Sequence, residues 1–310
     1  MANNTNRFVI PGVVFGVGLL LVVAALLKVG VGFGPGAALC FLGLALFGLS
    51  FIPHAHAVED APAPMPFFEK LGNIFFEPSA VFRNLRAHPR WFGALLISAL
   101  LSFVYTTAFT QRLTPERIVS FTLDKVAEKG WLPPEALAQA KEQGIAEAKS
   151  PPKIAGNAVT TFVGAFVLSC IFAGLYMLFV LLFGGRLGFW QGLSLAVWAA
   201  LPPVLIGKVL SLVLLYVKDP DDIHPLLGQN TLVTDNLGAL VRPADSPVLF
   251  SVLSAFGVLA FYHLWLTATG LRHASDRLSK GSAWTIAIIF WGIGLLFAVA
   301  SSALFGSFIS

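Results

Sequence analysis

Lys208 stands out among the residues that could do chemistry, because it is a cation inside an otherwise apolar stretch. It lies about ten residues before Lys218, and a helix rises about 1.5 Å per residue, so its depth is about 15 Å. A lysine at the centre of a bilayer costs about 2.5–3.5 kcal/mol on insertion scales. We therefore expect this amine to face protein or water and to find partners there.

Pro202 and Pro203 lie just before this lysine. Proline has no amide hydrogen, so the carbonyls of Trp198 and Ala199 should lose their helical donors and the span should kink. One interpretation is an ion or anionic-lipid site at a helix break. The other is a lysine satisfied by carbonyls and hydroxyls inside the bundle, and we favour this second interpretation.

His263 is the only histidine inside an apolar stretch. If its helix begins near Val248, the ring lies about 22 Å from that end, so a direct pair with Lys208 is not indicated. None of the 16 acidic residues lies within an apolar stretch. Proton- or sodium-coupled carriers place carboxylates there, which weakens the carrier hypothesis.

Two polar loop clusters combine histidines with acids, but neither has the spacing of a known metal site. The chain also lacks a G-x-S-x-G nucleophile elbow and a phosphate-binding G-x-x-x-x-G-K loop. We therefore predict no metal, no cofactor and no enzymatic activity, although a site assembled from distant loops stays open. The clusters are His54, His56, Glu59 and Asp60, and Asp219, Asp221, Asp222 and His224.

The elements that position these residues follow from composition. Of 310 residues, 56% are apolar and 12% are charged, about half the charged fraction of a soluble domain. About twenty apolar residues span the ~30 Å hydrocarbon core as a helix. We predict an all-α, polytopic integral membrane helical bundle with about seven transmembrane helices, its environment being the lipid bilayer. The apolar runs are 8–27, 31–52, 92–110, 154–183, 192–217, 248–270 and 283–308.

The first two runs form a predicted transmembrane hairpin over residues 1–53, followed by a linker at 54–66. A cleaved signal peptide is the alternative for 8–27, but that run exceeds a typical signal core and no small-residue cleavage site follows it. The net charge of +4 does not indicate nucleic-acid binding, because the cations are divided among separate loops.

Two polar insertions interrupt the later runs. Residues 67–90 alternate aromatic and apolar residues with arginines, typical of a helix lying in the membrane interface. A helix packed on neighbouring loops explains the pattern equally well. Residues 111–153 predict a helical hairpin, because Thr114-Pro115-Glu116 and Pro133-Pro134-Glu135 are helix starts.

Cations near span ends predict the orientation. With the N-terminus cytoplasmic, most loop arginines lie inside and the acidic 218–247 loop lies outside, although the basic 111–153 hairpin also lies outside. We predict a bacterial inner-membrane protein with its N-terminus in the cytoplasm and its C-terminus outside.

Several motifs resemble the Yip (Ypt/Rab-interacting protein) domain family, in its prokaryotic branch. They are Phe75-Phe76-Glu77-Pro78-Ser79-Ala80-Val81-Phe82-Arg83, His88-Pro89-Arg90-Trp91, the proline-bearing 196–207 span, and Trp265 with Thr269-Gly270-Leu271. The resemblance implies a five-span domain over 67–310 carrying the 111–153 insertion, so the 1–53 hairpin is a departure. It singles out Glu77, Pro78, Phe82, Pro89, Trp265 and Gly270 as motif positions.

The resemblance implies a membrane-organising or trafficking adaptor without known catalysis. Our leading hypothesis is therefore a non-enzymatic scaffold that contacts membrane or peripheral proteins, with a homo-oligomer left open and no nucleic-acid partner. The alternative is a permease or transport-accessory subunit with a site near Lys208 and the Pro202-Pro203 helix break.

Overall fold

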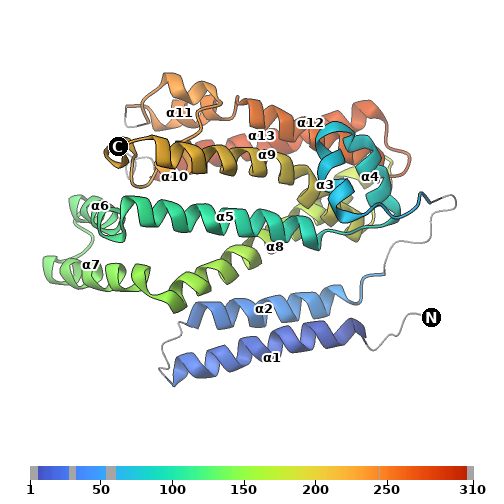
Figure 1. The fold of residues 1–310 in the computed structure, drawn as a ribbon. Helices are drawn as coiled ribbons and strands as arrows, with labels where there is room; N and C mark the ends of the chain where they lie inside the picture. The colour runs from blue at the N-terminus through green and yellow to red at the C-terminus, as the bar shows by residue number, and fades with distance from the viewer. Residues whose placement is uncertain (1–5, 28–32, 54–60, 244, 306–310) are drawn as a thin grey trace.

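The structure is a computed structural model, and it describes residues 6–27, 33–53, 61–243 and 245–305. The long helices lie side by side along one direction, and no strand occurs in these ranges (Figure 1). The predicted all-α membrane bundle is therefore confirmed. Within the described ranges, five helices are long and apolar enough to cross a membrane: α1 (Asn6–Leu26), α5 (Phe92–Leu113), α8 (Pro151–Leu182), α9 (Phe189–Val217) and α13 (Lys280–Phe305).

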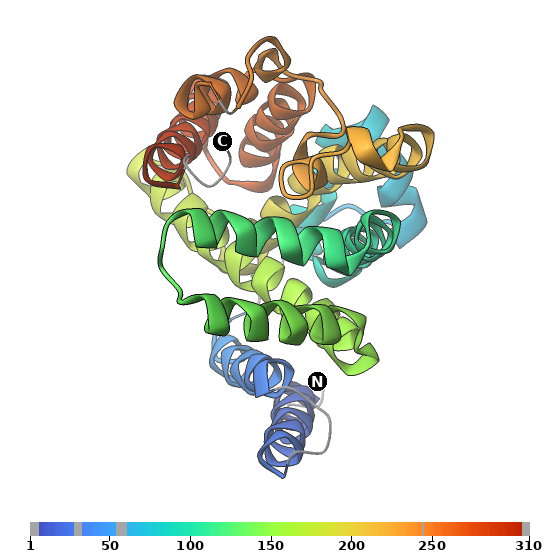
Figure 2. The same cartoon turned by 90° about the vertical axis from the view of Figure 1, so that its left-hand side faces the viewer.

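Two further helices, α2 (Phe33–Leu49) and α12 (Val258–Ala274), are apolar but only 17 residues long. The α1–α2 hairpin is held by close backbone contact, since a Cβ on Gly18 would lie 2.5 Å from the Cys40 nitrogen. On its other side α2 packs against α8, so the hairpin projects from the bundle with α1 outermost (Figure 2).

The expectation of one continuous helix over the run 248–270 is wrong. The structure divides this run into α11 (Pro247–Ser254) and α12, with a break at 255–257. The break is held by the preceding loop, because the Leu237 amide donates to the Phe256 carbonyl over 3.3 Å and the Val258 amide donates to the Asp235 carbonyl over 3.1 Å. The loop contains three short helical turns, η1 (Pro220–Asp222), α10 (Gly228–Thr231) and η2 (Leu237–Leu240).

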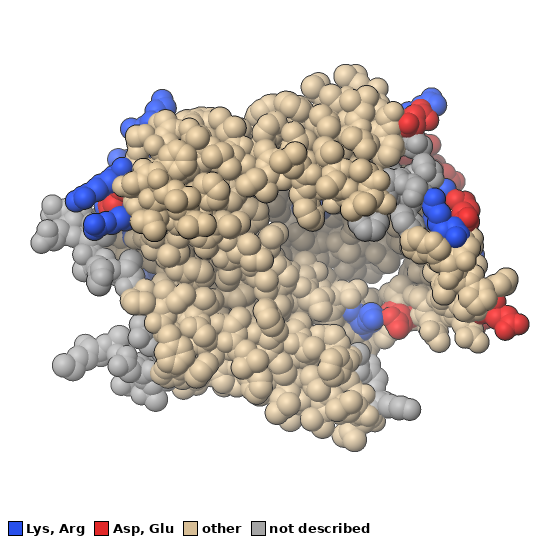
Figure 3. Space-filling model, turned by 180° about the vertical axis from the view of Figure 1, so that it is seen from behind, with Lys and Arg blue, Asp and Glu red and all other residues tan. Residues whose placement is uncertain are grey.

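Polar elements lie at the two ends of the bundle. At one end are α3 (Phe67–Phe76) and α4 (Pro78–Ala87), and at the other are α6 (Pro115–Glu128), α7 (Pro134–Lys149) and the 218–246 loop (Figure 1). In Figure 3 the charged side chains gather toward these ends and leave an uncharged band between them. This distribution is the one that a bilayer requires.

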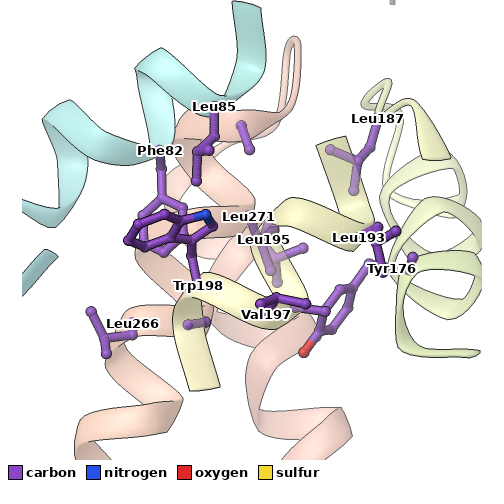
Figure 4. Packing of buried hydrophobic residues seen from close by; sticks show 14 of the residues in the cluster. Phe82, Leu85, Tyr176, Leu187, Leu193, Leu195, Val197, Trp198, Leu266 and Leu271 are labelled. Carbon is purple, nitrogen blue, oxygen red and sulfur yellow. The ribbon is translucent and has the colours of Figure 1, made fainter. Parts of the chain in front are cut away.

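The main core joins α4, α8, α9, α12 and α13. Trp198 of α9 is fully buried near Phe82 and Leu85 of α4 and Leu266 of α12 (Figure 4). Because α4 contributes three fully buried apolar side chains, the polar end is part of the same core as the spans. The whole of α3–α4 is therefore held in one fixed position.

Candidate functional site

The end of the bundle formed by segment 61–66, α3 and α4, hereafter the platform, carries the most distinctive surface. Pro78 begins α4 as its first residue, where its fixed φ and missing amide suit a helix start. Glu77 is the junction, because its amide donates to the Asn73 carbonyl over 2.7 Å and so ends α3. The platform is thus two short helices joined by one residue.

The platform is anchored on its inner side. Phe82 is fully buried, and its ring carbons would lie 3.0 Å from a Cβ built on Gly270 of α12. The indole of Trp198 donates to the Arg90 carbonyl over 2.7 Å, just beyond the half-buried Pro89. The motif positions Phe82 and Gly270 therefore meet in space, and a side chain at position 270 would push α4 away from α12.

An ion pair also ties the platform to the loops at the same end. Arg86 of α4 pairs with Asp276, which follows α12. The backbone of Asp276 exchanges two hydrogen bonds with Arg186, of 3.0 and 2.8 Å, and the Gln191 amide donates to the Arg86 carbonyl over 2.7 Å. α4, the loop after α8 and the loop after α12 are thereby joined at one corner of the bundle. The local sequence pattern did not predict the ion pair between Arg86 and Asp276.

The proline-rich segment 61–66 lies along α4. The Asn84 side chain donates to the Ala63 carbonyl over 2.8 Å and accepts from the Met65 amide over 3.3 Å. Between this segment and α4 lies a groove of about 770 Å³ whose lining includes Glu69, Arg83 and Arg86. The platform therefore presents a groove that contains two arginines and one glutamate, and two hydrogen bonds attach segment 61–66 to α4 beside it.

The outer side of α3 is aromatic. The side chains of Phe68 and Phe76 are 82% and 85% exposed, and Gly72 between them has open space around it. On the inner side, Ile74 is fully buried and Lys70 is 1% exposed. α3 therefore packs on the bundle with one side and presents aromatic residues outward with the other, and the interfacial position of 67–90 stays a prediction.

The sequence analysis did not single out Lys70, although its spacing from Phe67 and Ile74 puts it on the apolar face of the helix. Its amine has no hydrogen-bond partner among the described residues. Burial, and then the nearby charge of Arg90, lower the pKa of this amine to about 8. The platform therefore contains a cation that its surroundings do not stabilise.

Lys208 lies at the opposite half of α9. Its amine sits 4.4 Å from the ring centroid of Tyr105, a cation–π contact, and faces a cavity of about 170 Å³. α9 continues through Pro202 and Pro203 without interruption, so the chain is not broken at the prolines as expected. The helix lacks only the two backbone hydrogen bonds that proline cannot donate. Pro203 lines the cavity, whereas Pro202 is buried in the core.

His263 is not brought to Lys208. It lines a separate apolar cavity of about 460 Å³ between α8, α11, α12 and α13. Because α12 begins at Val258 and not near Val248, the ring lies about 8 Å from the start of its helix instead of about 22 Å. Trp265 is 39% exposed and stacks on Tyr262 with ring centroids 5.8 Å apart.

The Asp219–His224 cluster makes local bonds. Asp219 accepts from the Asp221 amide over 3.0 Å, and Asp221 pairs with Arg117 over 3.3 Å. The Nδ1 of His224 accepts from the Leu226 and Leu227 amides, each over 3.1 Å. These bonds shape the loop. The other cluster, at positions 54–60, lies outside the described residues.

Comparison with known proteins adds two findings. The family model of the Yip1 domain matches residues 72–301, which leaves out the α1–α2 hairpin. Membrane protein YknW of Bacillus subtilis (strain 168) is similar, being 28% identical over 231 residues that cover 74% of this chain and 89% of YknW. No solved structure matches the chain.

Proposed function

Because the chain belongs to the Yip1 domain family, we propose that it is a non-enzymatic scaffold or adaptor that gathers membrane or peripheral proteins at its platform. The observation that carries this proposal is the pair of exposed aromatic side chains, Phe68 and Phe76, on a helix whose other side is fixed to the spans. Large aromatics held rigidly in the open are typical of interaction surfaces, since little side-chain entropy is lost when a partner covers them.

The groove beside α3 indicates the chemistry of the partner. Arg83 is exposed, and Arg86 is only half-buried although it pairs with Asp276. Further cations on the same end are Arg90, Arg272, Arg277 and Lys280, all exposed. A partner segment with acidic residues next to an apolar patch complements this surface. A second copy of the chain is one candidate partner.

The same cations support a placement of the platform in the cytoplasm of a bacterial cell, at the inner membrane. α1 begins and α13 ends at opposite ends of the bundle, so the N-terminus is then inside and the C-terminus outside (Figure 1). The seven cations of 111–153 seemed to oppose this orientation. Four of these cations pair with acids in the same segment, but the rule counts lysines and arginines and not net charge, so this segment still opposes the proposed orientation: Lys125–Glu128, Lys141–Asp124, Lys149–Glu116 and Lys153–Glu147.

Affinity purification from native membranes tests the adaptor role. The test variant is Phe68→Ser with Phe76→Ser, and the control is Leu240→Ser, which removes an apolar side chain that is 78% exposed at the opposite end. We expect proteins that co-elute with the wild type and the control to be lost from the platform variant. An identical set from all three forms would contradict a docking role for α3.

A permease or transport-accessory role is the second candidate, and the cavity at Lys208 is the observation that favours it. It predicts a solute flux in proteoliposomes that Lys208→Met abolishes while the protein stays folded. The adaptor proposal predicts no flux from either form. Flux that survives Lys208→Met would argue against a path through this cavity.

A further inference from the structure

The cavity at Lys208 is built by residues distant in sequence. The 218–246 loop folds back over α9 and the start of α12, so polar side chains of the loop line the same cavity as the lysine. The space of about 170 Å³ is lined by Lys208 and Ser211 of α9 and by Gln229, Asn230, Asp235 and Asn236 of the loop. A cation in a span thus faces a polar roof instead of lipid.

The amine of Lys208 is the free charge of this cavity. Among the described residues it has no hydrogen-bond acceptor and no ion-pair partner, and its contact is the face of Tyr105. It is only half-buried, so the ammonium is not sealed into the protein. A half-buried cation that lacks an anionic partner attracts an anion more strongly than a cation in bulk water does.

The one carboxylate in the cavity is already engaged. Asp235 accepts from the Leu259 amide over 2.8 Å and from the Asn236 side chain over 3.4 Å. It therefore caps the N-terminus of α12, where the partial positive charge of the helix end offsets its own. Asp235 forms no ion pair with Lys208, so the lysine amine keeps its donors for a ligand, although the carboxylate in the same cavity opposes the binding of an anion.

We propose that the Lys208 cavity binds a small oxyanion of the phosphate class, either free phosphate or the phosphate of a lipid headgroup. An ammonium is a compact charge with three donors, which suits a tetrahedral oxyanion. The side-chain amide of Asn230 supplies a further donor, whereas the Ser211 hydroxyl is hydrogen-bonded to the Tyr105 hydroxyl. The cavity of about 170 Å³ has room for a phosphate group.

Anion binding at this site is a property separate from the adaptor role, and it does not require that the protein transports a solute. It lies at the opposite end of α9 from the core that holds the platform, so partner binding and anion binding can fail independently. An equilibrium binding measurement on purified full-length protein therefore tests the site even if the platform has no partner and no solute crosses the membrane.

The experiment titrates detergent-purified, delipidated protein with inorganic phosphate and, separately, with a short-chain phosphatidic acid, by calorimetry. The variant is Lys208→Met, and the matched control is Lys218→Met, which removes an exposed lysine at the end of the same helix. We expect Lys208→Met to weaken binding on the order of tenfold to a hundredfold, since a charge-assisted hydrogen bond is lost. The control should change the affinity less than about twofold.

The two arms distinguish the sources of the phosphate. Phosphatidic acid binding at least tenfold tighter than inorganic phosphate identifies a lipid headgroup, and equal affinities identify the free anion. A second variant, Asn230→Leu, keeps the lysine and should weaken binding severalfold if Lys208→Met fails to fold. The proposal is overturned if neither compound binds, or if Lys208→Met and Lys218→Met bind both compounds as tightly as the wild type.

Discussion

Replacement of Lys70 by methionine should stabilise the protein at neutral pH. The side chain is 1% exposed, and its amine has no hydrogen-bond partner among the described residues. Methionine has a similar length and no charge, so Lys70→Met fills the same space between α3 and the core. The substitution removes an uncompensated cation without opening a cavity.

The expected size follows from the pKa of this amine. Burial, together with the charge of Arg90, lowers it from 10.5 to about 8. Each unit corresponds to about 1.36 kcal/mol, so the charged amine costs the folded state roughly 3 kcal/mol below pH 8. Because the folded pKa is the lower one, the unfolded state binds more protons between pH 8 and 10.5, and stability rises with pH across that window.

Reversible unfolding in mixed detergent micelles, followed by tryptophan fluorescence at pH 7 and at pH 10, measures both effects. We expect Lys70→Met to be more stable than the wild type by roughly 1–3 kcal/mol at pH 7, and the gap to narrow at pH 10. Lys280→Met is the control, because Lys280 is exposed. A variant that is less stable than the wild type at pH 7 would refute the argument, since it would show that the amine has a partner.

Three further predictions concern other contacts. Gly270→Ala should destabilise the protein by about 1–3 kcal/mol in the same unfolding assay, because the added Cβ meets Phe82 and Leu195 at 3.0 Å. Gly292→Ala is the control, because position 292 has open space around it, and it should change the free energy of unfolding little. Arg117→Met should speed hydrogen exchange of the 218–228 amides, because Arg117 donates to the carbonyls of Pro220, Asp221 and Ile223. Unchanged protection of these amides would show that Arg117 does not hold the loop in place. Burial, followed by the charges of Lys125 and Arg117, lowers the pKa of His224. The stability that its neutral ring provides should therefore be lost as the pH falls below 6.5, and His224→Gln should flatten that part of the pH profile.

Much of the fold could be predicted from the sequence, because lipid requires long apolar runs that are easy to find. The bounds of α5, α9 and α13 follow such runs closely, and the prolines at Pro115 and Pro134 mark real helix starts. The break in the run 248–270 could not be predicted, because residues 235–237 cause it and their contact with Phe256 and Val258 is set by the tertiary fold.

The candidate sites were predictable only in part. The sequence identified Lys208 as an intramembrane cation, but the residues that complete its cavity come from a loop with no periodic pattern. The motif positions Phe82 and Gly270 were found through resemblance, and only the structure shows that they touch. Lys70 could have been found, because a lysine between Phe67 and Ile74 occupies an apolar helical face.

Photo-crosslinking in intact cells tests the docking role of the platform most directly. A photoreactive amino acid is placed at Phe76, and a second form carries it at Leu240, which is similarly exposed at the other end of the bundle. We expect position 76 to yield a discrete protein adduct that position 240 does not give. Adducts with lipid alone at position 76, or the same protein adducts at both positions, would contradict the claim that this platform binds a protein partner.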